Sequence, residues 1–258
     1  MNILAVGDIV GQNGVDFYTK NIGNIIKKYN VDFVIVNGEN SERGSGINKA
    51  IFKQLVENHA DVVTMGNHTW GKKDIFSFID DEPRLIRPIN YVEDLVGKGS
   101  VIIEKNGKKV AVINAIGRVD MGGNFECPFR ILENEIARLR GLGTDIIVID
   151  FHAEATAEKK ALAYYLQDKA NIIFGTHTHI QTNDDMIYPS GMGYITDIGM
   201  TGPKESIIGM DVAIALKRFL TQIPERYQVA EGPCKLDAVL FEVDEATDKV
   251  VKITKINI

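Results

Sequence analysis

Five short segments carry side chains that could bind metal ions, and each follows an apolar run typical of a β-strand. They are Gly7-Asp8, Asn37-Gly38-Glu39-Asn40, Gly66-Asn67-His68, His152 and Gly175-Thr176-His177-Thr178-His179. Carboxylates, imidazoles and amide oxygens are the ligands that divalent transition metals use in proteins. Two such metals held close together would make this chain a hydrolase that acts on a phosphate ester.

The charges of these groups suit a phosphate substrate. Asp8, Glu39 and a hydroxide bridging two divalent ions would leave a small net positive charge to attract the phosphate. The metals would lower the pKa of the shared water, so that a hydroxide forms near neutral pH. His68 directly follows Asn67 and need not bind a metal itself. Because unperturbed histidine titrates near pH ~6.5, His68 could instead donate a proton to the leaving oxygen.

The elements that must position these groups alternate along the first part of the chain. Short β-branched runs at 3–6, 33–36 and 62–65 are separated by helical spacing at 15–29 and 51–56. This alternation indicates parallel βαβ units. Ligands bind beyond the carboxyl ends of the strands in such sheets. The five segments can therefore converge on one point if their strands share one sheet or lie in two facing sheets.

The pattern changes near residue 100. Asn106-Gly107 between two apolar runs predicts a hairpin with a two-residue turn. Further helices are expected at 130–140, 157–166 and 210–220, strands at 146–151 and 172–174, and a closing hairpin within 236–258. No repeat, low-complexity stretch or linker interrupts the chain, which predicts one α/β domain over residues 1–258. Strands in both halves favour two packed mixed sheets with helices outside, although one large sheet would fit the same pattern.

Composition narrows the class of protein. The chain has 258 residues, of which 45% are hydrophobic and 25% charged, as in a soluble globular protein. A formal net charge of −6 disfavours broad, nonspecific binding to nucleic acid. Two cysteines without CxxC spacing predict a reduced protein. No signal peptide or apolar run of about 18 residues is recognisable, so we expect a cytoplasmic protein without membrane contact. A homo-oligomer is possible.

The order of the motifs resembles that of the calcineurin-like metallophosphoesterases. That family shows Asp-x-His, Gly-Asp, Gly-Asn-His, a lone His and Gly-His-x-His in this order. Two positions depart from the pattern, because Val10 replaces the first histidine and Glu39 replaces the bridging aspartate. Both departures match the YmdB-type branch, as do the strings Gly-Asp-Ile-Val-Gly, Phe-His-Ala-Glu-Ala-Thr and Gly-Thr-His-Thr-His. The resemblance covers residues 1 to about 200 at least.

This resemblance implies a four-layer αββα sandwich and a phosphodiesterase that acts on cyclic nucleotides, including 2′,3′-cyclic AMP. It implies two metal ions, with iron or manganese expected, and His68 as the catalytic acid. One metal would be held by Asp8, Glu39, Asn40 and His179, with Asn40 in the place of the missing histidine. The other would be held by Glu39, Asn67, His152 and His177, with Glu39 bridging. The expected partner is a small phosphodiester or cyclic nucleotide, without stable nucleic-acid binding.

Two other functions are compatible with these residues. A phosphomonoesterase or protein phosphatase would use the same metal core. A regulatory protein could hold a nucleotide without hydrolysing it, although such a module needs no proton donor like His68. The five motif segments contain no lysine or arginine, and only Arg43 and Lys72 lie close to them in sequence. This favours a singly charged diester over a monoester dianion, unless Arg118 or Arg130 folds over the site.

Three neighbouring features each fit more than one role. Glu154 could support His152 from behind, or it could be a solvated acid at the start of a helix. The Gly44-Ser45-Gly46 stretch lacks the pattern of a phosphate-binding loop, and we interpret it as a turn that could border the cleft. Trp70 is expected to be a core or rim aromatic more than a base-stacking one.

Overall fold

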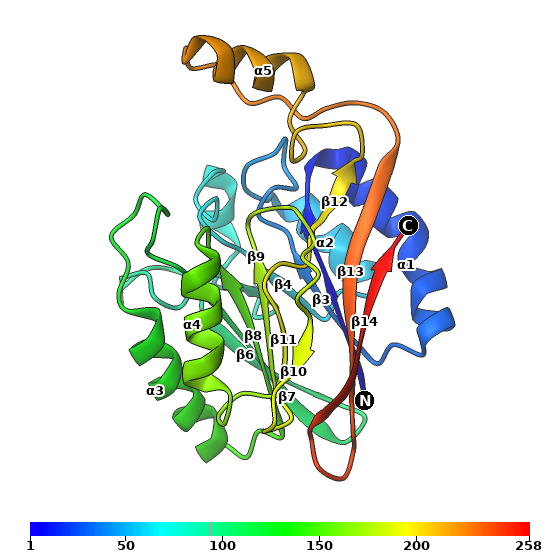
Figure 1. The fold of residues 1–258 in the computed structure, drawn as a ribbon, viewed down its shortest axis with the longest axis vertical. Helices are drawn as coiled ribbons and strands as arrows, with labels where there is room; N and C mark the ends of the chain where they lie inside the picture. The colour runs from blue at the N-terminus through cyan, green and yellow to red at the C-terminus, as the bar shows by residue number, and fades with distance from the viewer. Residues whose placement is uncertain (93) are drawn as a thin grey trace.

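Two β-sheets pack face to face, with helices on both outer faces, in the computed structural model, which describes residues 1–92 and 94–258 (Figure 1). The first sheet has the order β2-β12-β13-β1-β3-β4-β5, and β14 pairs with β13. Its strands are β1 (Asn2–Val6), β2 (Asp8–Ile9), β3 (Phe33–Asn37), β4 (Val62–Thr64), β5 (Leu85–Ile86), β12 (Met200–Pro203), β13 (Cys234–Val243) and β14 (Val250–Asn257). The sheet is mixed, because β13 runs antiparallel to β1.

The second sheet has the order β10-β11-β9-β8-β7-β6. Its strands are β6 (Ser100–Lys105), β7 (Lys108–Ile116), β8 (Ile146–His152), β9 (Ile172–Thr176), β10 (Met186–Ile187) and β11 (Gly193–Ile195). The helices are α1 (Gly11–Tyr29), α2 (Lys49–Glu57), the 3₁₀ helix η1 (Lys73–Ser77), α3 (Pro128–Gly141), α4 (Thr156–Leu166) and α5 (Val212–Thr221).

Successive side chains of the central strands pack alternately into the core between the two sheets and into the cores beneath the helices. Leu4 and Val6 of β1 pack in the core beneath α1 and α2, whereas Ile3 points into the core between the two sheets. In β8, Val148 joins the same inter-sheet core and Ile147 packs beneath α3 and α4. Successive side chains of a strand face opposite sides, so apolar residues on both sides give sheets covered on both faces. The predicted αββα sandwich is confirmed, and the single large sheet is excluded.

The central strands of each sheet are parallel, and this brings the motif segments together. β1, β3 and β4 are parallel neighbours in the first sheet. β7, β8 and β9 are parallel neighbours in the second. The motif segments follow the carboxyl ends of these strands, and polar contacts between residues of the two sheets join them there, from His152 to Glu39 and from the backbone nitrogen of His177 to Asp8.

Most predicted elements are present with shifted ends. The hairpin turns at Asn106 and Gly107, whose φ angles of 53° and 76° are those of the favoured two-residue turn. The closing hairpin is β13 and β14. Helix α1 begins at Gly11, four residues before the predicted start. The strands β2, β5, β10, β11 and β12 were not predicted, because two to four residues are too few to show a periodic pattern.

Helix α5 shows the predicted helical periodicity but contributes little to the core. It lies apart from the layers at the top of Figure 1, and of its residues only Ala215 is buried. Phe219 and Leu220 are 77% and 82% exposed. Its apolar spacing therefore indicated a helix correctly, without indicating where that helix packs.

Two smaller findings concern membrane contact and the cysteines. In the part of the chain that the structure describes, every helix is too short or too polar to span a bilayer. Cys127 and Cys234 are both free thiols.

Candidate metal centre

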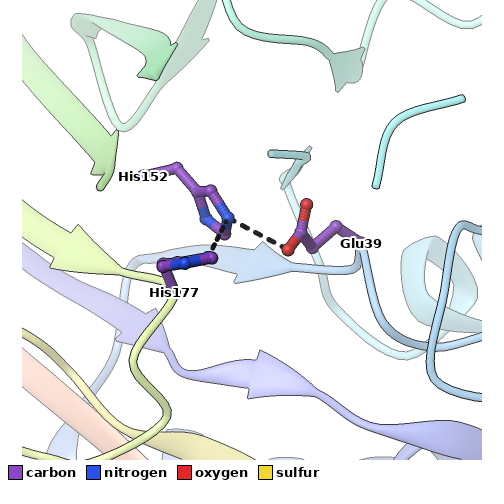
Figure 2. Close-up of side chains that lie close together, drawn as sticks. All are labelled: Glu39, His152 and His177. Atoms are coloured by element: carbon purple, nitrogen blue, oxygen red, sulfur yellow. Dashed lines mark hydrogen bonds and ion pairs between the residues drawn. The ribbon is translucent and has the colours of Figure 1, made fainter. Parts of the chain in front are cut away.

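Three donor atoms lie close to the Nε2 atom of His152, at the end of β8. His152 is the last residue of β8 and is fully buried. Its Nε2 lies 3.0 Å from Glu39 Oε1, 2.8 Å from Asn67 Oδ1 and 3.0 Å from His177 Nδ1. Figure 2 shows the two histidine rings and the carboxylate turned toward one another. Adjacent ligands of an ion with bonds of about 2.1 Å are about 3 Å apart, so these donors could hold one ion.

The hydrogen bonds of His152 leave the correct nitrogen free. His152 Nδ1 lies 2.9 Å from Thr176 Oγ1, and that hydroxyl donates to Asp150 Oδ1 at 2.6 Å. Because the hydroxyl hydrogen is directed at Asp150, Thr176 accepts a hydrogen bond from Nδ1–H. When the ring is neutral, as it would be on binding an ion, the lone pair is on Nε2, which faces the other donors. A partner that orients the second nitrogen in this way is characteristic of metal-binding histidines.

His177 and His179 resemble His152, because in each ring one nitrogen is hydrogen-bonded and the other is free. His177 Nε2 lies 3.1 Å from Glu154 Oε2, which leaves Nδ1 as the free acceptor. His179 Nδ1 donates to Ile208 O at 2.7 Å, which leaves Nε2 free. Glu154 is therefore a supporting residue, but for His177 and not for His152 as considered above. Burial, followed by repulsion from His152, lowers the pKa of His177 to about 3, so its ring is neutral and able to bind an ion.

A second group of donors lies beside the first. Asp8 Oδ1 is 3.7 Å from His179 Nε2, and Asp8 Oδ2 is 3.4 Å from the backbone nitrogen of His177. Although Asp8 is fully buried, its Oδ1 has no hydrogen-bond partner among residues 1–92 and 94–258. Burial raises the pKa of Asp8 well above its ordinary range. A buried carboxylate oxygen without a donor is costly, and a cation beside it would remove that cost.

Asn40 connects this second group to His68. Its Nδ2 lies 3.1 Å from His179 Nε2 and 3.4 Å from Glu39 Oε1, while its Oδ1 lies 2.9 Å from His68 Nδ1. In this orientation the amide nitrogen faces the second group, and nitrogen cannot serve as a ligand there. A half-turn of the amide plane exchanges the two atoms with little change in shape. The oxygen would then face the second group, and Nδ2 would donate to His68 Nδ1.

Glu39 lies between the two groups. Its Oε1 faces His152, and its Oε2 accepts a hydrogen bond from His68 N at 2.8 Å. Burial opposes ionisation of Glu39, but attraction to His152 outweighs burial and lowers the pKa of Glu39 to about 2. The same pairing outweighs the burial of His152 and raises its pKa to about 9. Glu39 is thus an anion that attracts positive charge to this point.

Backbone geometry brings the motif segments close enough for these contacts. A Cβ atom at Gly66 would lie 2.4 Å from both Glu39 Oε2 and His152 Nε2, so a side chain there would occupy the site. His177 and His179 have φ angles of 100° and 63°. Such angles are unfavourable for residues other than glycine and are often found at functional sites.

The predicted site residues are therefore brought together. Glu39, His152 and His177 offer ligand atoms that all lie within 4.8 Å of one another. Asn67 contacts His152, whereas Asp8, Asn40 and His179 form the adjacent group. His68 is half-buried, and its ring contacts Asn40. Together with Gly44, Ile208 and Tyr227, six of the predicted site residues line a hollow of about 120 Å³, which we call the metal-centre hollow.

The sequence analysis did not identify a buried ion pair that contacts the residues on either side of His177. Lys159 Nζ of α4 lies 2.8 Å from Asp197 Oδ2 and donates to Thr176 O at 2.8 Å. Asp197 Oδ2 also accepts from Thr178 N at 3.1 Å. Both charged side chains are almost completely buried. The pair fixes the backbone on either side of His177, and a lysine in an amphipathic helix gives no signal of such a role.

We expect Lys159→Met to destabilise the protein strongly. The change leaves the Asp197 carboxylate buried without its partner, and breaking such pairs costs about 3–5 kcal/mol of unfolding free energy. Urea denaturation of the metal-free protein would measure the loss. Lys160→Met is the matched control, because Lys160 is 40% exposed and pairs with Asp184 at 3.4 Å. That exposed pair should contribute less than about 1 kcal/mol. Similar losses in the two variants would contradict the role given to Lys159.

The class of protein follows from the fold and its relatives. A crystal structure of a 5′-nucleotidase precursor from Thermus thermophilus has the same fold, with a TM-score of 0.60 at 11% identity, covering 100% of this chain and 54% of that one. The chain therefore shares its fold with that nucleotidase. The model of the YmdB-like protein family matches residues 4–256. The chain belongs to the YmdB-like family.

Closer relatives agree with this placement. The chain is 46% identical over 256 residues to a 2′,3′-cyclic-nucleotide 2′-phosphodiesterase of Bacillus subtilis, which covers 99% of this chain and 96% of the relative. A crystal structure described as a novel phosphatase from Mycoplasma pneumoniae superposes with a TM-score of 0.94 at 34% identity, over 100% of this chain and 93% of that one. The resemblance inferred from the motifs is confirmed.

Proposed function

We propose that this protein is a dinuclear-metal phosphodiesterase that hydrolyses cyclic nucleotides such as 2′,3′-cyclic AMP. The prediction of an enzyme of the phosphodiesterase class is confirmed by its relationship to the Bacillus subtilis enzyme. The observation that supports the metal centre most is the set of donors around His152 Nε2, at 2.8–3.0 Å. The unpartnered, buried oxygen of Asp8 supports a second ion beside it.

The proposed ligands divide between two ions. Asp8, Glu39, Asn40 and His179 would hold one, and Glu39, Asn67, His152 and His177 the other. Nitrogen and oxygen donors without a thiolate suit iron or manganese. Two bound ions would act as a Lewis acid toward the phosphate and lower the pKa of a water to give the nucleophile. For Asn40, ligation requires the amide orientation that places its oxygen toward His179.

We give His68 the role of general acid. Its ring lines the metal-centre hollow and contacts Asn40, yet it lies outside the donor group around His152. The acid is the imidazolium form of His68, because the N–H of a neutral imidazole is too weak an acid to protonate a leaving oxygen. Its Nδ1 lies beside Asn40, so Nε2–H would be the proton that passes to the leaving oxygen of the substrate and leaves a neutral ring.

Other expectations remain part of the proposal. We propose one domain over residues 1–258, because the inter-sheet core joins strands from both halves of the chain. The free thiols Cys127 and Cys234 fit a reducing compartment such as the cytoplasm. A homo-oligomer stays a prediction, which light scattering would test.

We expect a preference for phosphodiesters over phosphomonoesters. Among the described residues that line the metal-centre hollow there is no lysine or arginine, so a monoester dianion lacks a cationic partner there. A diester carries one negative charge and needs less compensation. The value of kcat/KM should be at least about tenfold higher for 2′,3′-cyclic AMP than for 3′-AMP, a difference of about 1.4 kcal/mol.

Both substrates should be assayed on one manganese-loaded preparation, with a chelator-treated sample as the control. A clear preference for the monoester would contradict the proposed phosphodiesterase activity and support a phosphatase. Tight binding of the nucleotides without hydrolysis of either would support the regulatory binding protein instead.

A further inference from the structure

A second hollow, of about 540 Å³, opens beside the metal centre and is lined by three cationic side chains. These are Arg43, Lys72 and Arg226, and we call the hollow the cationic cavity. Its wall also includes Gly11 and the next two residues of α1. Except for Tyr227, the residues that line it differ from those that line the metal-centre hollow. The proposed metal centre makes no use of this cavity.

The cavity carries an excess of positive charge. Within the part of the chain that the structure describes, no carboxylate lies at ion-pair distance from Lys72 or Arg226. Arg43 lies 3.5 Å from Glu42 but is 84% exposed, so that pair is weak. Among the lining residues only Glu231 is acidic, which leaves two more cations than anions.

Helix α1 adds to this positive potential. Its first turn contains no acidic residue, and Val10 at its N-cap makes no side-chain hydrogen bond. The amide groups at this end are therefore uncapped by side chains, and the N-terminus of a helix carries a partial positive charge. Three cationic side chains and this helix end around one hollow make a site for an anion, and phosphate is a preferred ligand of such sites.

The two hollows share their walls. Gly11 N at the start of α1 donates to Asn40 O at 2.9 Å, and Gly71 N, next to Lys72, donates to His68 O at 2.9 Å. Tyr227 lines both hollows, and its ring packs against Gly44, where a Cβ would lie 2.2 Å from Tyr227 Cε1. The loop 43–45 also borders both, with Gly44 lining the metal-centre hollow and Arg43 and Ser45 lining the cationic cavity. The two hollows are therefore adjacent, and a molecule that extends from the metal centre past Tyr227 would enter the cationic cavity.

The sizes of the two hollows and the charge of the cationic cavity indicate which part of a substrate the cavity would bind. Small-molecule sites usually enclose about 300–1,000 Å³, so a hollow of about 120 Å³ accommodates only part of a nucleotide. The cyclic phosphate would occupy the metal centre, and the rest of the substrate would extend beyond it. A nucleoside 2′,3′-cyclic phosphate has no other charge to place beside Lys72 and Arg226. A nucleotide with a further phosphate on its 5′ oxygen does.

We propose that the cationic cavity binds a second phosphate of the substrate. Preferred substrates then carry a 2′,3′-cyclic phosphate together with a phosphate on the 5′ oxygen. That phosphate could be a terminal 5′-phosphate or the internucleotide phosphate of a short oligoribonucleotide. This inference rests on the proposed function, because it assumes that the cyclic phosphate is the group hydrolysed.

Three substrates and two variants test it on the metal-loaded protein. Adenosine 2′,3′-cyclic phosphate is compared with its 5′-phosphorylated form and with a diadenosine dinucleotide that ends in a cyclic phosphate. A charge-assisted contact to phosphate contributes about tenfold or more, so kcat/KM should be higher by at least this factor for one or both of the longer substrates. Comparing kcat/KM between the two longer substrates shows whether the cavity prefers a terminal 5′-phosphate or an internucleotide phosphate.

In the double variant Lys72→Ala/Arg226→Ala, the ratio of kcat/KM between phosphorylated and unphosphorylated substrates should fall toward one. Lys73→Ala is the matched control, because Lys73 is the exposed neighbour of Lys72 and does not line the cavity. That variant should keep the wild-type ratio. Equal kcat/KM values for all three substrates in the wild type, or an unchanged ratio in the double variant, would overturn the inference.

A binding measurement separates this inference from the proposed function. Calorimetry compares adenosine 3′,5′-bisphosphate with 3′-AMP, and the bisphosphate should bind at least about tenfold more tightly in the wild type but not in the double variant. If this pattern appears while no cyclic phosphate is hydrolysed, the phosphate site stands and the proposed activity fails. If cyclic phosphates are hydrolysed and the two ligands bind equally, the activity stands and the phosphate site fails.

Discussion

Glu39→Gln should remove metal from both proposed sites and lower kcat/KM by about 10³-fold or more. The substitution weakens the binding of both ions, and these ions stabilise the transition state. Glu39 is fully buried, with one carboxylate oxygen beside His152 and the other facing His68 N. Glutamine has nearly the same shape but neither the charge nor the second oxygen. The buried carboxylates would then no longer offset the charge of two divalent ions.

Metal content is the direct readout, measured by mass spectrometry on protein purified without chelator. Glu42→Gln is the matched control, because Glu42 lies in the same loop but contacts Asn48 and Arg43 outside the metal centre. It should keep two metals per chain. Circular dichroism and thermal denaturation of both variants would show that the fold is intact. A Glu39→Gln protein that retained two tightly held metals and full activity would disprove the bridging role.

The convergence of the motif segments could be predicted, because it depends on a general property of parallel strands. Asp8, Glu39 and His152 lie at or just beyond the carboxyl ends of strands, and neighbouring parallel strands end at the same edge of a sheet. The alternation of apolar runs and helical spacing identified those strands. Gly66 was identified as part of a motif, but the structure supplies its reason, since only a residue without a side chain permits the chain to pass so close to Glu39.

Other parts of the site depend on tertiary contacts that leave no local pattern. Lys159 and Asp197 are 38 positions apart in sequence, and each resembles an ordinary surface residue in its own segment. Tyr227 and Arg226 border the site although they follow a helix with no chemical motif. The side-chain orientation of Asn40 likewise depends on His68 and His179, which approach it only in the folded chain.

The cations near the site illustrate the same limit. Counting residues near the motifs identified Arg43 and Lys72 and suggested a general shortage of positive charge. The structure separates two regions, a metal-centre hollow without cationic side chains among its described lining residues and a cationic cavity beside it. The preference for a diester therefore concerns the phosphate at the metal centre. The cationic side chains would bind another part of the substrate. The sequence alone could not show that these side chains line a separate cavity.

His68→Ala should keep both metals and lower kcat by about 10²–10⁴, the usual contribution of a general acid. The physical reason is the position of His68, which lines the metal-centre hollow without belonging to the donor group of Glu39, His152 and His177. Removing its ring leaves those ligand atoms in place but leaves the departing oxygen without a proton donor. The loss should therefore appear in kcat with metal content unchanged.

The dependence on the leaving group makes this prediction specific. A nitrophenyl ester has a leaving oxygen that needs little protonation, so His68→Ala should impair it much less than 2′,3′-cyclic AMP, whose leaving group is a ribose hydroxyl. His59→Asn is the matched control, because His59 lies outside the metal-centre hollow and has a φ angle of 72°, which asparagine tolerates. It should behave like the wild type on both substrates. An equal loss on both substrates in His68→Ala, or the loss of either metal, would mean that His68 supports the metal centre and does not act as the acid.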